Sequence, residues 1–378
     1  MTYFQRTVLS DLENKLRPNK VLILLGARRV GKTQLIKKYL RNTNLKPLQL
    51  NGEDLNDARL LEERTVSNYS ILLQGIDVLV IDEAQNIPEI GLILKVIVDT
   101  IEGIRVLVTG SSMFDLANKL GEPLVGRKHT LYIFPLAQME FSAQENFKET
   151  TEHLELRLIY GGYPELTHYD SWYEKKDYLK EIINSYLLKD ILMFDGIKNS
   201  DKIYYLLRLV AFQIGKEVSL QELGKQLQMS KNTVERYLDL LSKVFVVFKV
   251  EGFSRNLRKE ITKTSRWYFY DNGVRNAILN DFNMLQNRTD IGQLWENYLV
   301  SERVKKQHYH KMFKQNYFWR TYDQQELDWL ETEAESISGF EFKWNEDKKS
   351  KVPVAFAKAY PEASFEVITR KNYLVFIT

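Results

Sequence analysis

The chain has 378 residues, enough for two or three domains with separate cores. Apolar residues make up 44% and charged residues 27% of the sequence, which excludes a disordered or fibrous chain. The 53 Lys and Arg residues nearly balance the 50 Asp and Glu residues, so the net charge of +3 neither indicates nor excludes a nucleic-acid partner. Because there is no cysteine, disulfides, thiolate metal sites and a cysteine nucleophile are excluded.

Neither a signal peptide nor a membrane span is predicted. The first fifteen residues lack the apolar core of a signal peptide. The richest apolar stretch, residues 92–110, is interrupted by four charged residues, and no run of about 18 apolar residues occurs. We therefore expect a cytoplasmic protein without a membrane partner.

The first third of the chain alternates short apolar strands with helical patterns, which predicts an α/β fold with a parallel sheet. Several of these strands are apolar throughout, as expected for strands buried on both faces. The pattern places helices over 33–42 and 92–102, and strands over 21–25, 47–51, 77–82, 106–110 and 130–134.

Beyond Pro135 the pattern becomes helical over about 150–215, with no convincing strand. A helix–turn–helix pattern follows at 219–242, and then a β-rich basic stretch to about 270. From about 290 onward we expect a helix, three strands, a helix and two final strands. We predict three domains, at 1–200, 201–285 and 286–378.

Residues 26–33, GARRVGKT, match the phosphate-loop pattern GxxxxGK[ST] between an apolar strand and a helix. Loop amides and the helix amino terminus attract phosphates, Lys32 is predicted to reach the β- and γ-phosphates, and the Thr33 hydroxyl to bind Mg²⁺. The predicted ATP-binding residues here are Gly26, Ala27, Arg28, Arg29, Val30, Gly31, Lys32, Thr33 and Gln34.

An apolar strand at 77–82 ends in Asp82 and Glu83, the Walker B arrangement. Asp82 is predicted to hold Mg²⁺, and Glu83 to act as the general base for the attacking water. The next strand ends in polar residues, of which Thr109 or Ser111 would sense the γ-phosphate; an ordinary turn explains them equally well. Arg127 precedes the fifth strand and would stabilise the transition state, in its own chain or in a neighbouring subunit.

The stretch 219–242 has the spacing of a helix–turn–helix, opened by the capping box of Ser219 and Glu222. A strand at 244–253 would supply a wing, which predicts a winged-helix domain. Lys231, Asn232 and Arg236 are expected on the exposed face of the second helix. The basic residues expected at the wing are Arg255, Arg258, Lys259, Lys263 and Arg266. Duplex DNA binding and docking of a protein partner both remain open.

A second candidate site lies near the carboxyl terminus. Asp328 and Glu341 lie in strand-like segments with twelve residues between them, and Lys343 follows two residues later. This is the PD-(D/E)xK arrangement, in which carboxylates bind Mg²⁺ and a lysine helps to activate water for phosphodiester cleavage. Glu296 is a candidate third carboxylate ligand. A solvated charge on an edge strand remains the alternative.

The chain resembles bacterial and archaeal AAA-superfamily ATPases with a C-terminal domain of unknown function related to PD-(D/E)xK nucleases. The resemblance covers nearly the whole chain. It rests on residues 26–33, 78–85, 108–112, 126–127, 134–141 (FPLAQMEF), 161–165 (GGYPE), 268–279, 295–302 and 326–343. One departure is Ala27, where the family often has proline.

The resemblance implies that Lys32, Thr33, Asp82 and Glu83 bind and hydrolyse ATP with Mg²⁺, and it strengthens Arg127 as an arginine finger. It implies an AAA/RecA-like P-loop domain, a helical region, a winged helix and a restriction-endonuclease-like α/β domain. Three functions follow: an ATPase that controls a DNA nuclease, an ATP-driven switch with a structural C-terminal domain, and a signalling ATPase that oligomerises and recognises protein.

Overall fold

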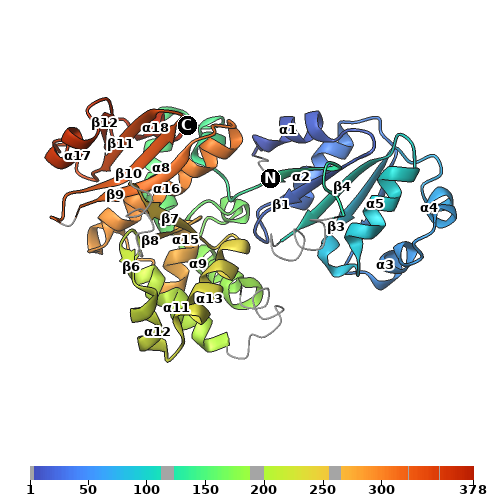
Figure 1. Ribbon diagram of the computed structural model, residues 1–378, viewed down its shortest axis with the longest axis horizontal. Helices are drawn as coiled ribbons and strands as arrows, with labels where there is room; N and C mark the ends of the chain where they lie inside the picture. Colours follow the sequence, from blue (N-terminus) through green and yellow to red (C-terminus); the bar gives the residue numbers. More distant parts are fainter. Residues whose placement is uncertain (1–3, 112–122, 188–199, 255–264, 322, 349) are drawn as a thin grey trace. The chain divides into compact units, whose positions relative to one another are not determined.

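The computed structural model describes residues 4–111, 123–187, 200–254, 265–321, 323–348 and 350–378 (Figure 1). The chain forms two compact units. One comprises Thr2–Phe134 with Lys243–Phe245, and the other Pro135–Ser242 with Val246–Thr378. These units differ from the three ranges predicted above, which remain a prediction. No helix in the described part of the chain has the length and apolar character needed to span a bilayer.

The first unit is built on a five-stranded parallel sheet, as predicted. Its strand order is β2-β3-β4-β1-β5, and every neighbouring pair is parallel. The strands are β1 (Lys20–Leu25), β2 (Pro47–Asn51), β3 (Val78–Asp82), β4 (Arg105–Gly110) and β5 (Lys128–Tyr132). The helical elements are α1 (Val8–Lys15), α2 (Lys32–Arg41), α3 (Leu55–Glu62), α4 (Val66–Leu72), η1 (Ala84–Asn86) and α5 (Ile90–Thr100).

The central strands are apolar because both faces of the sheet are covered. In β1 the five residues after Lys20 are buried, and β3 and β4 are buried along nearly their whole length. The fifth strand begins two residues earlier than predicted, at Lys128 rather than Thr130. Hydrogen bonding to β1 decides its start, because Lys128 lies opposite Val21, whereas the apolar pattern marked only its carboxyl half.

The second unit begins with helices, as the sequence predicted for 150–215. They are α7 (Gln138–Ser142), α8 (Phe147–Tyr160), η2 (Pro164–His168), α9 (Trp172–Glu181), η3 (Ile182–Leu187) and α11 (Ser200–Phe212). Asn146 begins α8, because its side chain accepts a 3.0 Å hydrogen bond from the Glu149 amide and Glu149 bonds back to the Asn146 amide. Gly161 ends the same helix with a φ of 76°.

Two helices at the predicted helix–turn–helix follow, α12 (Leu220–Leu227) and α13 (Lys231–Lys243). Ser219 accepts a hydrogen bond from the Glu222 amide and begins α12, and Gln228 ends it in the left-handed region at a φ of 52°. Short strands flank this pair of helices in the sequence. Strand β6 (Glu217–Val218) precedes it, and β7 (Val247–Gly252) and β8 (Ser265–Phe269) follow it. Strand β8 pairs antiparallel with both β6 and β7.

These strands continue into a seven-stranded sheet of order β12-β11-β10-β9-β7-β8-β6. The joint is a parallel pairing of β7 with β9, where Glu251 lies opposite Tyr317. The remaining strands are β9 (Gln315–Arg320), β10 (Glu326–Glu333), β11 (Ser336–Phe342) and β12 (Ser364–Ile368). The helices of this region are α15 (Asn272–Leu279), η4 (Leu285–Asn287), α16 (Ile291–Tyr309), α17 (Val354–Ala359) and α18 (Tyr373–Ile377).

The last predicted strand is wrong, because residues 373–377 form helix α18. Its apolar run is too short for periodicity to distinguish a strand from a helix. Packing decides the conformation: the Tyr373 ring lies 5.3 Å from that of Trp295 on α16, and Phe376 lies under the guanidinium of Arg303.

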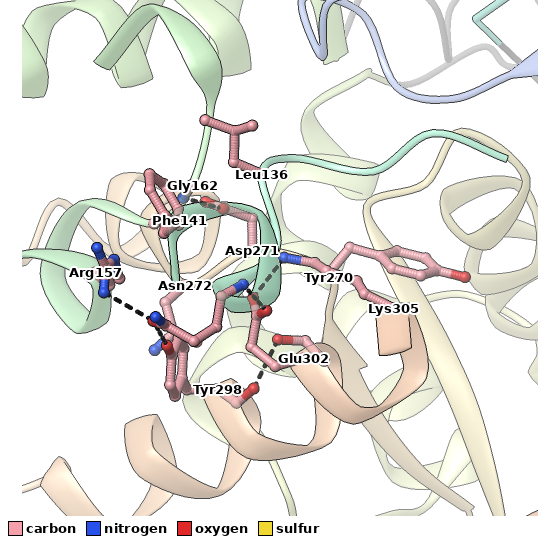
Figure 2. A pocket seen from close by; sticks show the side chains of 13 residues that line it. Leu136, Phe141, Arg157, Gly162, Tyr270, Asp271, Asn272, Tyr298, Glu302 and Lys305 are labelled. Atoms are coloured by element: carbon pink, nitrogen blue, oxygen red, sulfur yellow. Dashed lines mark hydrogen bonds and ion pairs between the residues drawn. The ribbon is translucent and has the colours of Figure 1, made fainter. Parts of the chain in front are cut away.

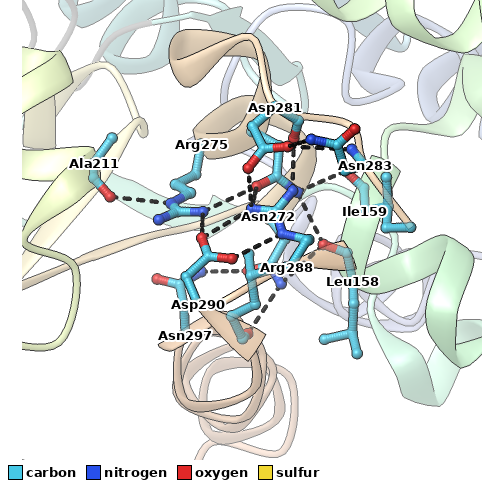
Figure 3. Close-up of polar contacts among 12 residues, drawn as sticks. Leu158, Ile159, Ala211, Asn272, Arg275, Asp281, Asn283, Arg288, Asp290 and Asn297 are labelled. Carbon is cyan, nitrogen blue, oxygen red and sulfur yellow. Dashed lines mark hydrogen bonds and ion pairs between the residues drawn. The ribbon is translucent and has the colours of Figure 1, made fainter. Parts of the chain in front are cut away.

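A buried polar network holds α15 against α8 and α16 (Figure 3). The Asn276 amide donates to the carbonyl oxygens of Leu158 and Ile159 at 3.1 and 2.8 Å. Arg275 and Arg288 both hydrogen-bond the carboxylate of Asp290, at 2.5 and 2.8 Å. Because these partners come from distant parts of the chain, the network fixes the helices' relative positions in the second unit.

Candidate functional site

The phosphate loop follows β1 and leads into α2, in the arrangement that the motif requires. Gly31 has a φ of 96°, and Arg29 also lies in the left-handed region at 65°, so the backbone folds back sharply before the helix. Gly26 has no room for a side chain, since a Cβ atom there would lie 2.1 Å from the carbonyl oxygen of Ile133. Gly26, Ala27 and Val30 are buried, and Arg28, Arg29, Thr33 and Gln34 reach the surface to different extents.

Lys32 has its ammonium within this loop. The side chain is only 5% exposed, and its Nζ donates hydrogen bonds of 2.8 and 3.0 Å to the carbonyl oxygens of Gly26 and Ala27. A buried ammonium held by backbone carbonyls provides a positive charge at the centre of the loop. A loop with this positive charge at its centre is suited to bind an anionic group such as a phosphate.

Thr33 and Asp82 meet at the carboxyl edge of the sheet, although 49 residues separate them. The Thr33 hydroxyl donates a 2.9 Å hydrogen bond to Oδ2 of Asp82. A hydroxyl and a carboxylate are oxygen ligands of the kind that Mg²⁺ prefers. These two predicted ligands are therefore brought together by the fold.

Thr109 joins the two acids at the end of β3. Its hydroxyl hydrogen-bonds Oδ1 of Asp82 and accepts a 3.0 Å hydrogen bond from the Glu83 amide. This contact follows from the strand order, because β4 lies between β1 and β3 in the sheet. Glu83 itself has a φ of 49°, which places its side chain on a tight turn directly after the strand.

Gln85 was not singled out by sequence reasoning. Its side-chain amide donates a 2.5 Å hydrogen bond to Oε2 of Glu83 and lies 3.4 Å from the hydroxyl of Ser111. Gln85 therefore orients the predicted base and connects it to the predicted sensor. The sequence signal for this role was the position of Gln85 two residues after Glu83. A short helical turn at Ala84–Asn86 brings the Gln85 side chain back toward the Glu83 carboxylate.

Arg6 was also missed, because it lies in an N-terminal segment without a motif. The side chain is 4% exposed, and its guanidinium donates 2.6 Å hydrogen bonds to the carbonyl oxygens of Val30 and Phe134. It thereby connects the phosphate loop to the segment after β5. Only the approach of residues distant in sequence reveals this role.

Arg127 is not brought to the phosphate loop of its own chain. It directly precedes β5, and its carbonyl accepts a hydrogen bond from the amide of Val21 at the start of β1. The phosphate loop begins at the other end of β1, after four further residues that span about 13 Å. The side chain, 37% exposed, forms an ion pair with Asp99 at 2.6 Å.

In the second predicted site, in the other unit, two of the four predicted residues form a hydrogen-bonded pair, and the other two bond to neighbouring groups. Lys343 hydrogen-bonds Glu341, and Oδ2 of Asp328 accepts a 2.8 Å bond from the amide of Phe342. Glu296 lies on α16, where Oε1 accepts a 2.7 Å hydrogen bond from the hydroxyl of Tyr268. Among the described residues, however, no group of three or more His, Asp or Glu side chains is arranged to hold a metal ion.

Burial dominates the electrostatics of this second site. Burial and the charge of Asp328 raise the pKa of Glu296 to about 8, and burial and the charge of Glu341 raise the pKa of Asp328 to about 6. Burial works to lower the pKa of Lys343, but the pairing with Glu341 outweighs it and raises the pKa. The lysine therefore stays charged at neutral pH, and burial disfavours the charged form of Glu296.

Arg266, predicted to face DNA from the wing, is instead a buried member of this second site. It is 4% exposed, and its guanidinium lies 2.8 Å from Oε2 of Glu326. The prediction failed because the basic run 255–266 was treated as one exposed stretch, whereas Arg266 belongs to β8. The other four basic residues of that run lie outside the described residues, as does Ser112.

A small cleft with both polar and apolar lining lies in the second unit (Figure 2). Four of the segments that carry the family resemblance line it: 134–141, 161–165, 268–279 and 295–302. Glu302 accepts a 2.6 Å hydrogen bond from the amide of Gln138 and a 2.7 Å bond from Lys305. The polar groups that line the cleft hydrogen-bond mainly to one another, which indicates that the cleft is a structural junction.

The parallel sheet and the phosphate-loop geometry of the first unit are those of a P-loop nucleotide-binding domain. Residues 18–142 match a family model described as an AAA domain. Residues 151–285 and 291–376 match two models described as domains of unknown function, DUF8612 and DUF4143. The matches support an AAA-type ATPase and carry no description of a nuclease.

Similar proteins occur in archaea and bacteria. An uncharacterized protein of Methanocaldococcus jannaschii, MJ1544, is 24% identical over 97% of this chain and 84% of its own length. Rv2008c of Mycobacterium tuberculosis, also uncharacterized, is 26% identical over 90% of this chain and 74% of its own. A solved structure, the Walker-type ATPase PABY2304 of Pyrococcus abyssi, covers 73% of this chain and 96% of its own with a TM-score of 0.54 and 16% identity. It supports the fold.

Proposed function

We propose that this chain hydrolyses ATP with Mg²⁺ and uses the reaction as a switch for its second unit. The observation that carries the proposal is the hydrogen bond between Thr33 and Asp82, beside the buried ammonium of Lys32. A phosphate loop, a hydroxyl and a carboxylate at one sheet edge are the parts that nucleotide hydrolysis requires. An AAA-type ATPase with these parts needs no further cofactor for phosphoryl transfer to water.

Each residue then has a distinct role. Loop amides from Gly26 to Thr33, with Lys32, would bind the phosphates. Thr33 and Asp82 would hold Mg²⁺, which would supply positive charge at the phosphate oxygens. Glu83 accepts the proton of the attacking water, and Gln85 holds its carboxylate toward the site. Thr109 bonds to both Asp82 and Glu83, and Ser111 contacts Gln85. These contacts with the predicted Mg²⁺ ligand and base support a role for either residue as the γ-phosphate sensor.

Arg127 acts, in this proposal, on the nucleotide of a neighbouring subunit. At the amino edge of the sheet it lies too far from its own phosphate loop, which begins at the carboxyl edge. Its pairing with Asp99 holds it at the surface until a neighbour provides a stronger anionic partner. The oligomer that this requires is part of the proposal.

The decisive experiment compares two glutamates with the same backbone geometry. Glu83→Gln is expected to bind a fluorescent ATP analogue with unchanged affinity and to release phosphate at least about 100-fold more slowly. Glu89→Gln is the matched control, since Glu89 has the same φ of 49° but is exposed and paired with Arg64. Undiminished ATP turnover in Glu83→Gln would exclude Glu83 as the general base.

For the second unit we propose a winged helix that binds duplex DNA. Helix α11, strand β6, helices α12 and α13, and the antiparallel β7–β8 pair have the element order of such a domain. Lys231, Asn232 and Arg236 are exposed on α13, as the sequence predicted. Glu235 is exposed on the same helix and opposes binding, which keeps docking of a protein partner as the alternative.

Fluorescence anisotropy with a labelled duplex distinguishes these partners. DNA binding predicts that affinity falls with salt and that Lys231→Ala with Arg236→Ala weakens it, with a shallower salt dependence. Lys225→Ala, which removes one exposed positive charge from α12, serves as a control outside α13. Salt-independent or unchanged binding would favour a protein partner.

DNA cleavage by the C-terminal domain, the other function suggested by the sequence, has weaker support. Its required carboxylates do not form a metal-binding group among the described residues. If cleavage occurs, it must depend on a divalent metal and disappear in Lys343→Ala while ATP hydrolysis continues. Incubation of plasmid DNA with the full-length protein, with and without ATP, tests it.

A further inference from the structure

Arg266 places a positive charge in the middle of the second predicted site. Its guanidinium lies 2.8 Å from Oε2 of Glu326 and 3.8 Å from Oε1 of Glu296. The same group stacks over the ring of Phe318, with 4.6 Å between the guanidinium carbon and the ring centroid. With acids on two elements and an aromatic face on a third, the guanidinium is held on several sides.

The carboxylates predicted to bind Mg²⁺ each have a hydrogen bond from the protein. Tyr268 donates to Glu296, the Phe342 amide donates to Asp328, and Lys343 donates to Glu341. Glu296 is also confined by Gly215, where even an added Cβ atom would lie 2.8 Å from its Oε1. A metal ion needs carboxylate lone pairs that converge on one point, and here they are directed to separate partners.

We propose that Arg266 is, together with Lys343, a resident cation of this carboxylate cluster, which the fold uses as a structural core in place of a metal centre. A divalent ion entering beside the guanidinium would be repelled by it and would also have to displace the donors already bound. The donor set therefore does not fit a catalytic metal. This inference is independent of the ATPase proposal, because all its residues lie in the second unit.

The position of Arg266 explains what such a core does. Arg266 lies on β8, Glu296 on α16 and Glu326 on β10, so the cation connects two strands of the seven-stranded sheet to the long helix. Removing one member of a buried, hydrogen-bonded charge cluster leaves the others unpaired in a poorly solvated place. We therefore expect Arg266 to stabilise the region predicted to be a winged helix together with the C-terminal domain.

Titration of the full-length, nucleotide-free protein with Mn²⁺ by calorimetry tests the proposal. An Asp82→Asn background removes the Mg²⁺ ligand of the first unit. In that background, the titration should be the same with and without Asp328→Asn. Micromolar Mn²⁺ binding that Asp328→Asn abolishes would overturn the proposal, and this comparison requires no variant of Arg266.

Thermal unfolding provides the second measurement. Arg266→Met should lower the unfolding midpoint of the second unit by roughly 10 °C. Mn²⁺ should restore part of this loss only in Arg266→Met, because only there do Glu296 and Glu326 lack their cation. Arg320→Met is the control, since Arg320 pairs with Glu217 at the surface and should shift the midpoint by about 2 °C or less. Equal midpoints for Arg266→Met and wild type would also overturn the proposal. Should Arg266→Met not fold, the milder Arg266→Lys replaces it.

Discussion

Arg6 and Val30 are joined by a 2.6 Å hydrogen bond from a buried guanidinium to a carbonyl oxygen of the phosphate loop. The same guanidinium holds the carbonyl of Phe134, the last residue of the first unit's long segment. A phosphate loop can bind only if its backbone keeps the curvature that directs its amides at the ligand. Arg6 therefore maintains this curvature from outside the motif.

Replacement of Arg6 by methionine should reduce kcat/KM for ATP by about tenfold or more, because a charge-assisted hydrogen bond to the loop is lost. The loss should appear mainly in KM, since Arg6 shapes the loop and does not contact the reacting water. Steady-state phosphate release measures both constants. Arg17→Met is the control, as Arg17 donates to the carbonyl of Asn14 on the surface. An unchanged KM would exclude this role.

Thr109→Val should reduce kcat by about 10- to 100-fold, while nucleotide affinity stays within a few-fold of wild type. The valine keeps the shape of threonine but loses the hydroxyl that contacts both Asp82 and the Glu83 amide. Thr109→Ser retains the hydroxyl and should remain close to wild type in single-turnover hydrolysis. Equal losses in the valine and serine variants would indicate a packing effect instead.

Gly161→Ala should strongly destabilise the second unit. Its φ of 76° is unfavourable for alanine, and the new Cβ would lie 2.0 Å from Oδ1 of Asp271. Gly103→Ala separates the two causes, because Gly103 has a φ of 79° but nothing within 4 Å of its Cβ position. In denaturant unfolding, the free energy of unfolding should fall by about 1 kcal/mol for Gly103→Ala and by at least about 3 kcal/mol for Gly161→Ala. Similar losses would contradict the steric account.

Glu331 should make the second unit sensitive to acid. Burial works to raise the pKa of Glu331, but hydrogen bonds from Arg303 and Lys314 outweigh burial and hold the pKa below its usual value of 4.5. Since the folded-state pKa is the lower one, this stabilisation is complete above about pH 4.5 and is lost as the pH falls through the folded-state pKa.

Glu331→Gln should therefore lower the free energy of unfolding by about 3 kcal/mol at pH 7. The difference in this free energy between the variant and wild type should shrink below pH 4.5. Urea unfolding between pH 7 and pH 3 measures it. Glu333→Gln, on the exposed end of the same strand, should change little at any pH. A constant difference for Glu331→Gln across this range would exclude the ionisation as the cause.

The sequence was informative where a local pattern determines the structure. Four of the five parallel strands were predicted correctly within about one residue, because each is a short apolar run. The roles of the phosphate loop, Asp82 and Glu83 stay predictions. The exposed residues of α13 were also predicted, since helical spacing alone separates the buried Val234 and Leu238 from Lys231 and Arg236.

The features that sequence missed depend on pairing between distant segments. Nothing local to Arg266 distinguishes a buried cation from a basic wing, and nothing near Arg6 marks its approach to Val30. The parallel pairing of β7 with β9, which unites the predicted wing and C-terminal domain in one sheet, has no sequence signature either. Pairings of this kind are decided by the fold as a whole.

If Arg127 acts on a neighbouring subunit, as proposed, the rate of ATP hydrolysis depends on the protein concentration. An arginine that cannot reach the phosphate loop of its own chain contributes only within an assembly, so the rate per chain should rise with protein concentration and then level off. Two inactive variants would then complement each other. Chains with Arg127→Ala retain an intact phosphate loop and chains with Lys32→Ala retain the arginine, so a mixture should recover activity that neither has alone.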